Sequence, residues 1–349
     1  MKILSIVVPT YNVEKYLERC LNSLLYNENI LKDIELIIVN DGSKDKSLSI
    51  AKKYEKKYSE TVIIIDKENG GHGSTINAGL KIATGKYFRV IDSDDWVNID
   101  DFYLYIDELK KHDEDIILTD YNKELLYSGE INEFKYKSLE YNKTYNLNKF
   151  NFKILDQDYF FMATTTFKTE KLRKSNLFLD EKTFYVDMEF ILLPILQMDT
   201  MVYLNFNIYR YFIGRPDQSI NIQSYVRNRM HHEKVVKRLL EFYRNIPRKN
   251  SRSIYVKTIL IQLLNSHYSI YCKAKLTSQK DVKEIKEFDK YLKNNYCELY
   301  ENLRNEHRYI KWNQKTFFLF SQIFNNIMSR IANKFDYIKM NRGEKVEKN

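Results

Sequence analysis

Four short, mainly apolar runs, separated by segments with helical spacing, constrain the fold of this chain more than any other feature. The runs cover residues 3–8, 35–40, 62–65 and 87–91. Strands that are apolar on both faces and alternate with helices are typical of a parallel sheet with helices on either side. The sequence therefore predicts an α/β fold with a mainly parallel sheet in the first part of the chain.

Polar residues that follow the first two runs are placed to begin helices. Asn12 precedes a helical pattern that extends to Leu25, and Ser43 precedes one that extends to Tyr54. Side-chain oxygens of Asn and Ser accept hydrogen bonds from the N–H groups of a first helical turn. We therefore expect Asn12 and Ser43 to act as helix N-caps.

Each predicted strand ends in a polar loop. These loops are Pro9–Asn12, Asn40–Ser43, Lys67–Gly71 and Asp92–Asp94. The carboxyl ends of parallel strands meet at one edge of a sheet, and ligands bind at that edge in α/β folds. The sequence predicts that loops far apart in the chain form one binding edge.

The last of these loops begins a strongly acidic stretch. Asp92, Asp94 and Asp95 follow directly after a strand that is predicted to be buried. Crowded carboxylates raise each other's pKa unless a cation neutralises them. Oxygen ligands suit Mg²⁺ or Mn²⁺, which keep open positions for substrate phosphates. The alternative is an acidic turn in front of a helix that starts near Asn98.

Taken in order, these loops resemble the motifs of the family-two glycosyltransferases. The resemblance covers about the first hundred residues and rests on Val7–Asn12, Val39–Ser43, Asn69–Gly71, Asn77–Gly79, Ala83–Gly85 and Asp92–Asp95. It implies a Rossmann-like GT-A fold that binds a nucleotide-sugar, with a metal-binding Asp-x-Asp motif.

The resemblance also implies which residues bind the donor. Those expected at the nucleotide-sugar are Pro9, Thr10, Tyr11, Asn12, Asp41, Lys67, Asn69, Gly71, Asp92, Ser93, Asp94 and Arg210. Pro9 and Tyr11 would lie against the uracil or ribose, and Asp41 would accept a hydrogen bond from the base. Asp94 would hold the Mn²⁺ or Mg²⁺ that bridges the donor phosphates. Taken singly, these residue types also suit strand ends, turns and helix caps.

The chain departs from the family at one position. Many members carry an arginine before the asparagine that matches Asn77, whereas this chain has Ile76. Lys67 or His72 would then have to supply the contact that the arginine makes.

A second acidic stretch matches the position of the family's catalytic base. The second member of an acidic pair corresponds to Asp187, and the first member is replaced by Val186. Such a base takes the proton of the acceptor hydroxyl as its oxygen attacks the anomeric carbon, and a single displacement inverts the configuration. Glu189 is the reserve candidate, and a helix N-cap is the alternative role for Asp187.

The segment Tyr209–Ser219 resembles the family's loop that closes over the active site. Arg210 or Arg215 would meet the diphosphate, because guanidinium groups pair well with phosphate oxygens. A surface salt bridge is the alternative.

The second part of the chain has a different sequence pattern. Helical periodicity with many Lys and Arg residues runs through 225–246, 252–274, 279–303 and 315–338. We expect a GT-A domain over 1–220, an α-helical domain over 221–340 and a disordered tail over 341–349. The apolar stripe of 315–338 would pack on other helices, lie on an anionic membrane face or form a homo-oligomer interface.

Composition limits the class of protein. The 349 residues carry a net charge of +9, which permits anionic partners. Three distant cysteines give no disulfide framework, and no motif indicates nucleic-acid binding. The first apolar run is too short for a signal peptide, and no run is long enough to span a membrane. We expect a cytoplasmic protein, soluble or peripheral at the inner face of the plasma membrane.

The sequence therefore predicts a metal-dependent, inverting glycosyltransferase. It would move a hexosyl or N-acetylhexosaminyl group from a UDP-sugar to a glycan or lipid-linked acceptor in bacterial surface-polysaccharide synthesis. One alternative is a catalytically degenerate GT-A scaffold or binding module. The other is a nucleotidyltransferase, which would usually carry a glycine- and lysine/arginine-rich phosphate loop near the N-terminus; the sequence has none there.

Overall fold

The computed structural model describes residues 2–155, 159–214, 222–247, 250–273, 279–315 and 318. The chain divides into two compact units. Unit 1 comprises Met1–Gln218 and Lys237–Val256, and unit 2 comprises Ser219–Val236 and Lys257–Asn349. The predicted domain boundaries at residues 220 and 340 stay predictions.

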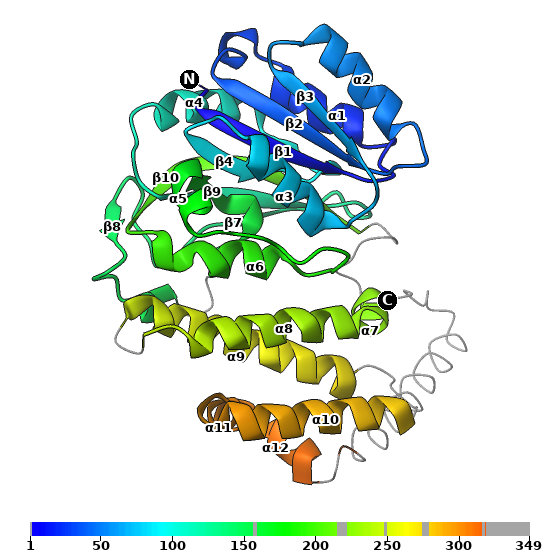
Figure 1. Ribbon diagram of the computed structural model, residues 1–349. Helices are drawn as coiled ribbons and strands as arrows, with labels where there is room; N and C mark the ends of the chain where they lie inside the picture. Colours follow the sequence, from blue (N-terminus) through cyan, green and yellow to red (C-terminus); the bar gives the residue numbers. More distant parts are fainter. Residues whose placement is uncertain are drawn as a thin grey trace, which may run out of the picture. The chain divides into compact units, whose positions relative to one another are not determined.

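Unit 1 contains a mixed sheet with the strand order β3-β2-β1-β4-β9-β6-β10-β5, in which β7 also pairs with β6 and β8 with β10 (Figure 1). The strands are β1 (Leu4–Thr10), β2 (Ile34–Asp41), β3 (Val62–Lys67), β4 (Tyr87–Val90), β5 (Trp96–Val97), β6 (Ile116–Leu125), β7 (Ile131–Phe134), β8 (Thr144–Asn146), β9 (Thr165–Lys168) and β10 (Thr200–Ile213). The first four strands pair in parallel, as their apolar runs predict. The strand β10 is parallel to β6, whereas β5, β7, β8 and β9 pair in the antiparallel sense.

Helices cover both faces of this sheet. Those of unit 1 before the helical region are α1 (Leu17–Leu25), α2 (Ser47–Lys57), α3 (His72–Ile82), α4 (Ile99–Leu109), α5 (Thr169–Lys174) and α6 (Asp187–Leu192). Short 3-10 helices span Glu28–Ile30, Phe152–Leu155, Met162–Thr164 and Leu193–Gln197.

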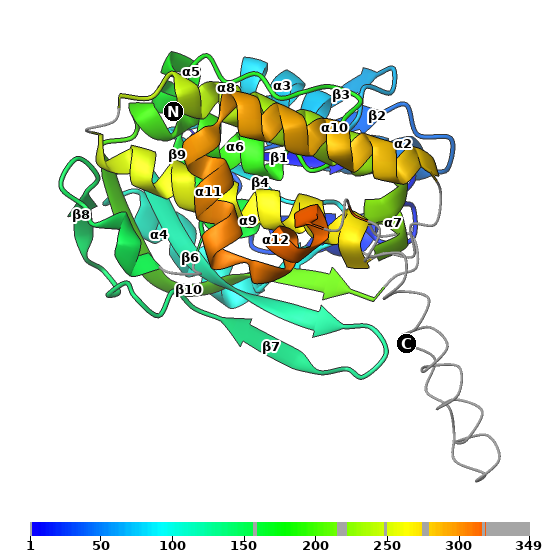
Figure 2. The ribbon, with the colours of Figure 1, turned by 90° about the horizontal axis from the view of Figure 1, so that it is seen from below.

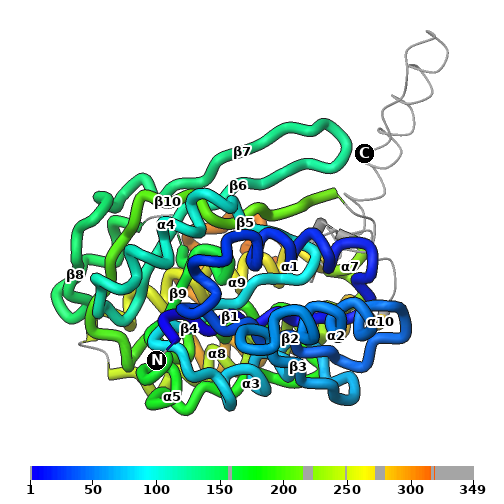
Figure 3. The backbone as a smooth tube through the Cα atoms, turned by 90° about the horizontal axis from the view of Figure 1, so that it is seen from above, coloured from blue at the N-terminus to red at the C-terminus, as the bar shows by residue number. Residues whose placement is uncertain are grey.

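Alternate side chains of β1 point to opposite helices, because successive strand residues face opposite sides. Leu4, Ile6 and Val8 lie in one core cluster with buried residues of α1, α2 and α4. On the other side, a Cβ atom added to Gly79 in α3 would lie 2.3 Å from a methyl carbon of Val7. Figure 3 shows α1 and α4 on one side of β1 and β2, and α3 on the other.

The two predicted N-caps are wrong. The helix α1 begins at Leu17 and α2 at Ser47, each several residues beyond the predicted cap. Asn12 instead accepts a hydrogen bond from Lys44 N through Oδ1 (2.7 Å), and its own N–H donates to Ser43 Oγ (3.1 Å). Asn12 has a positive φ of 52° in the loop after β1. The two polar side chains therefore join the loops after β1 and β2 to each other.

The region 121–150 contains the end of β6 and all of β7 and β8. The strands β6 and β7 form a hairpin, in which Tyr121 pairs with Phe134 (Figure 2). The strand β8 pairs with the start of β10.

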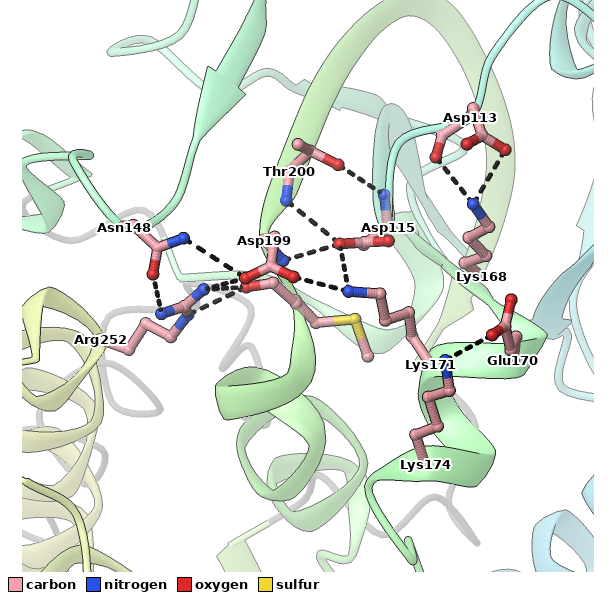
Figure 4. A network of polar contacts seen from close by, with 11 residues as sticks. Asp113, Asp115, Asn148, Lys168, Glu170, Lys171, Lys174, Asp199, Thr200 and Arg252 are labelled. Carbon is pink, nitrogen blue, oxygen red and sulfur yellow. Dashed lines mark hydrogen bonds and ion pairs between the residues drawn. The ribbon is translucent and has the colours of Figure 1, made fainter.

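A polar network joins the start of helix α9 (Ser251–Lys273) to the edge of the sheet (Figure 4). Arg252 is 3% exposed, and it donates to Met198 O from Nε (2.9 Å) and to Asn148 Oδ1 from Nη1 (2.8 Å). Lys171 Nζ lies 2.6 Å from Asp199 Oδ2, which connects α5 to the same network. A buried guanidinium needs such partners, because an unpaired charge is costly away from water.

The remaining helices are α7 (Ile222–Arg227), α8 (Arg229–Arg244), α9, α10 (Gln279–Asn295), α11 (Cys297–Glu306) and α12 (Arg308–Lys315). None of the helices over the described residues is long and apolar enough to cross a membrane. The apolar stripe predicted for 315–338 lies outside the described residues except for its start and residue 318, and so does the tail of 341–349.

Unit 2 buries a histidine pair. His232 Nδ1 lies 3.2 Å from His267 Nδ1, and the two rings stack with their planes 9° apart. The exposed fractions are 3% for His232 and 0% for His267. Burial lowers the pKa of His232 to about 4, because desolvation disfavours the imidazolium.

The lowered pKa predicts a loss of stability on mild acidification. The unfolded chain binds a proton at His232 near its ordinary pKa of 6.5, whereas the folded protein does so only near 4, so stability falls as the pH drops between these values. We expect the titration of His232 to lower the free energy of unfolding at pH 5 by about 2 kcal/mol relative to pH 7. Urea unfolding at both pH values measures the loss, which His232→Gln should remove and His231→Gln should retain. An equal loss in the His232→Gln variant would contradict the assignment.

Candidate functional site

The predicted binding edge is assembled by the parallel strands. The register pairs Thr10 at the end of β1 with Asn40 of β2, and Val7 of β1 with Val90 of β4. The loops after β1, β2, β3 and β4 consequently begin at the same edge of the sheet. Tyr11 is 50% exposed there, whereas Thr10 is buried.

Asp41 organises the loop after β3. Its carboxylate is 3% exposed and lies 2.9 Å from Lys67 Nζ through Oδ1. The same oxygen accepts from Gly70 N, and Oδ2 accepts from Gly71 N, both at 2.8 Å. The backbone oxygen of Asp41 accepts from Asn69 Nδ2 at 3.0 Å. Asp41 thus shapes residues 67–71, and its predicted contact with a nucleotide base stays a prediction.

The three carboxylates after β4 have different surroundings. Asp95 is fully buried, accepting from Tyr209 Oη at Oδ2 (2.6 Å) and from Phe212 N at Oδ1 (2.8 Å). Burial, followed by the charges of Asp94 and Asp92, raises the pKa of Asp95 well above its ordinary value. Asp92 and Asp94 are partly exposed, while Ser93 between them is buried. The binding edge therefore presents two carboxylates, and the third holds the end of β10.

Residues of α1 and β10 fix the backbone of this acidic turn. Asp92 N donates to Tyr209 Oη at 3.3 Å, and Cys20 Sγ donates to Asp92 O at 3.7 Å. Arg19 Nη2 donates to Asp94 O at 3.2 Å, and its guanidinium lies 3.5 Å from the ring centroid of Trp96. Tyr209, which the sequence predicts in a loop over the active site, lies in β10 instead. Its contacts with the acidic turn and those of Arg19 were not predicted, because contacts between distant residues carry no local signal.

His72, the first residue of α3, contacts the acidic turn. Its Nε2 atom lies 2.9 Å from Asp92 Oδ1. Burial alone would lower the pKa of His72, but the hydrogen bond to Asp92 and the charges of Asp92, Asp187 and Asp94 together raise it. His72 is therefore the side chain that bonds to Asp92, whereas Lys67 is bound to Asp41 and to Ser74 Oγ.

Asp187 reaches the same edge from far along the chain. It is the first residue of α6 and is partly exposed. Burial raises its pKa, while the charge of His72 opposes this shift. A carboxylate with a raised pKa is a stronger base than an ordinary aspartate.

The segment before α6 is clamped to α3. Asn77 donates to Leu179 O from Nδ2 at 2.9 Å and accepts from Leu179 N at Oδ1 at 2.8 Å. Lys182 N donates to Gly70 O at 2.5 Å. Gly73 also allows close approach, since a Cβ atom there would lie 2.4 Å from Asp180 O. These contacts hold the residues before Asp187 against the loop that carries His72.

Glu189 and Arg210 are bound elsewhere. Glu189 is fully buried and accepts from Arg238 Nη1 (2.8 Å) and Asp180 N (2.9 Å), so it serves an internal ion pair. Arg210 donates to Asn207 Oδ1 at 2.6 Å, and its Nε lies 3.6 Å from Glu124 Oε1. Arg215 lies outside the described residues.

The donor set at the edge suits a metal that is shared with a substrate. Among the described residues, no three histidine, cysteine or acidic side chains are arranged to hold a metal ion by themselves. Asp94 offers carboxylate oxygens beside Asp92, and this negative charge raises the pKa of Asp95. Mg²⁺ and Mn²⁺ bind through few protein oxygens when phosphates and water complete the shell. The residues present therefore fit a divalent cation bound together with a diphosphate.

A hollow of about 840 Å³ lies at the opposite end of β4 and includes Lys86, Asp113, Lys168, Glu170 and Lys174 in its lining. Its carboxylates are paired, Asp113 with Lys86 and Lys168, and Glu170 with Lys174. This hollow lies at the opposite end of β4 from the acidic turn, since Lys86 precedes β4 and Asp92 follows it. The candidate site is therefore the carboxyl edge.

The family model "Glycosyl transferase family 2" matches residues 5–172, which contain this edge except for Asp187. The chain carries a family 2 glycosyltransferase domain. The predicted resemblance is thereby confirmed, and it extends beyond the first hundred residues.

Curated relatives of this glycosyltransferase domain are similar over the same part of the chain. "Uncharacterized glycosyltransferase EpsJ" of Bacillus subtilis (strain 168) is 41% identical over 115 residues, which are 33% of this chain and 33% of that protein. "Poly(ribitol-phosphate) beta-N-acetylglucosaminyltransferase TarS" of Staphylococcus aureus (strain Mu50 / ATCC 700699) is 38% identical over 117 residues, 33% of this chain and 20% of TarS. The similarity thus spans a third or less of the length of these relatives.

Solved structures show the fold. Residues 1–349 of S. aureus TarS, in complex with UDP-GlcNAc, superpose with a TM-score of 0.67 at 18% identity, covering 95% of this chain and 92% of that one. The mannosyltransferase PcManGT of Pyrobaculum calidifontis, in complex with GDP-Man and Mn²⁺, has a TM-score of 0.50 at 13% identity, covering 92% and 86%. The predicted class, a GT-A α/β domain followed by a helical region, is confirmed.

The hydroxyl of Tyr209 should matter for the stability of the glycosyltransferase domain. Tyr209→Phe leaves both Asp95 Oδ2 and Asp92 N without this partner, and we expect it to lower the free energy of unfolding by about 1–3 kcal/mol. Tyr87→Phe is the matched control on β4, because the buried Tyr87 hydroxyl has no hydrogen-bond partner among the described residues. Urea unfolding compares the two variants. Equal losses would contradict a specific role for Tyr209.

Proposed function

We propose that this chain transfers a sugar from a nucleotide-sugar, with uridine diphosphate as the nucleotide, to a glycan or lipid-linked acceptor. The observation that carries the proposal is the meeting of Asp92 and Asp94 with Asp187 at one edge, with His72 bonded to Asp92 and influenced by the charge of Asp187. A donor-binding carboxylate pair and a separate basic carboxylate are what transfer by direct displacement requires.

In this proposal Asp187 is the catalytic base. It would accept the proton of the acceptor hydroxyl as that oxygen attacks the anomeric carbon, and the configuration would invert in a single displacement. Asp94 would hold Mn²⁺ or Mg²⁺, which would neutralise the charge on the departing diphosphate. Arg19, bonded to the backbone of Asp94, would place a further positive charge near the phosphates.

The similarity to TarS supports the choice of donor and setting. TarS is named as a poly(ribitol-phosphate) N-acetylglucosaminyltransferase and has been crystallised with UDP-GlcNAc. We propose bacterial surface-glycan synthesis at the cytoplasmic face of the membrane as the setting of this chain. Peripheral membrane contact and homo-oligomerisation through the helical region stay predictions.

Release of UDP from UDP-GlcNAc and other UDP-sugars, in the presence of Mn²⁺, tests the proposal. We expect the wild-type chain to release UDP from at least one donor. Release of pyrophosphate from UTP and a sugar phosphate would instead favour the nucleotidyltransferase alternative. A wild-type chain that acts on none of these substrates would favour the scaffold alternative.

Substitutions of Asp187 and Glu189 should have different effects on activity and stability. Asp187→Asn should lower kcat for UDP release by about 10²–10⁴-fold without loss of fold, because it removes the base. Glu189→Gln should lower the unfolding free energy, since it breaks the buried pair with Arg238. Kinetics and urea unfolding of both variants measure the contrast. A wild-type kcat in Asp187→Asn would exclude Asp187 as the base.

A further inference from the structure

The solvent-exposed side of helix α2 carries charge of one sign. The exposed residues of this helix are Ser49, Lys52, Lys53, Lys56 and Lys57, and the N-cap residue Lys46 is exposed as well. At 3.6 residues per turn, these positions fall within an arc of about 140° around the helix axis. We refer to the five lysines as the lysine face.

The acidic residues in and beside α2 bond to backbone groups rather than to the lysine face. Glu55 is the one acidic residue of the helix, and it is partly buried and accepts from Ile64 N of β3 at 3.2 Å. Asp45, directly before the N-cap, accepts from Glu14 N and Ser47 N, both at 2.9 Å. Within the part of the chain that the structure describes, none of the five lysines forms an ion pair.

Lysines on other helices are paired with acids one turn away. Lys174 Nζ lies 2.5 Å from Glu170 Oε1 on α5, and two lysines of α10 are paired with glutamates at the same spacing. On α2, Lys52 is instead followed four residues later by Lys56. Like charges at this spacing destabilise a helix, and an anionic partner removes their repulsion. The lysine face is therefore suited to bind an anion.

The form of the lysine face selects the kind of anion. The helix packs on β3, the first strand in the order of the sheet, and Figure 1 shows α2 beside β3. Lysine side chains that diverge from one side of a helix do not enclose a small anion, whereas an extended anionic surface contacts several of them at once. Tyr54 and Tyr58 are partly buried and stack on each other, so the face offers no open ring to a nucleic-acid base.

We propose that the lysine face of α2 binds an anionic membrane surface. Each lysine near a bilayer is attracted by anionic lipid headgroups, and these attractions add up along the face. Residues 42–46 connect α2 to β2, which ends at Asp41 of the candidate site. Membrane contact through α2 thus keeps the carboxyl edge near a lipid-linked acceptor. The inference rests on the proposed function for this setting alone, because the binding itself needs no catalysis.

Co-sedimentation of the full chain with lipid vesicles tests the proposal. We expect the wild-type chain to bind vesicles in which about one-third of the phosphatidylcholine is replaced by phosphatidylglycerol, and not vesicles of phosphatidylcholine alone. Binding should be lost as the NaCl concentration rises from about 0.1 M to about 0.5 M, because salt screens exposed charges. A wild-type chain that does not bind the anionic vesicles overturns the proposal.

Two double variants locate the binding surface. Lys52→Gln with Lys56→Gln should weaken vesicle binding at least about 10-fold. The matched control is Lys280→Gln with Lys283→Gln, which removes the same charge from exposed positions of α10 and should retain binding. Equal affinities in the two variants would assign binding to net charge or to another surface, such as residues 315–338, and overturn the lysine face. Binding of single-stranded DNA in preference to the anionic vesicles would overturn the membrane as its partner.

A second readout separates this inference from the proposed function. Release of UDP from UDP-sugars without vesicles reports catalysis, and the α2 double variant should retain the wild-type rate. A chain that binds anionic vesicles through the lysine face but releases no UDP supports the inference and contradicts the proposed function. A chain that releases UDP but does not bind these vesicles gives the opposite result.

Discussion

The crowding of Asp92, Asp94 and Asp95 after β4 is the constraint on which the rest of the site depends. Three carboxylates in four residues repel one another, and the fold resolves this by giving them different partners. Asp95 turns inward to Tyr209 and Phe212 of β10, and Asp92 bonds to His72. Arg19 donates to the backbone oxygen of Asp94, whose side chain is partly exposed. The negative charge is thereby concentrated where a cation and a diphosphate would bind.

Hydrogen bonds between loops explain how distant parts of the chain reach one edge. Asp41 forms hydrogen bonds that set the path of residues 67–71, and α3 begins directly after that loop with His72. Asn77 of α3 then clamps the segment that leads to Asp187. Polar contacts between distant segments thus position the carboxylates, and the most buried of them, at Asp41 and Asp95, fix a geometry because unpaired polar groups are costly in the interior.

Much of the first half of the fold was predictable, because apolar strand runs and parallel pairing depend on local patterns. The sequence also predicted that the loops after β1 to β4 begin at one edge, whereas the roles of their residues and of Asp187 stay predictions. The N-caps predicted at Asn12 and Ser43 were wrong. Asn12 donates to Ser43 and accepts from Lys44, so these residues join two loops and do not bond to the start of a helix. Arg19, Tyr209 and the Glu189–Arg238 pair were missed, because contacts between residues far apart in sequence leave no local pattern.

The central claim is that the edge at Asp94 binds a divalent cation together with a nucleoside diphosphate. Isothermal titration calorimetry of UDP, with Mn²⁺ and with EDTA, tests it most directly. We predict binding that requires Mn²⁺ and is weakened at least about 10-fold by Asp94→Asn, a loss that corresponds to about 1.4 kcal/mol. Binding of UDP that is equally tight with EDTA, or unchanged in Asp94→Asn, would contradict it.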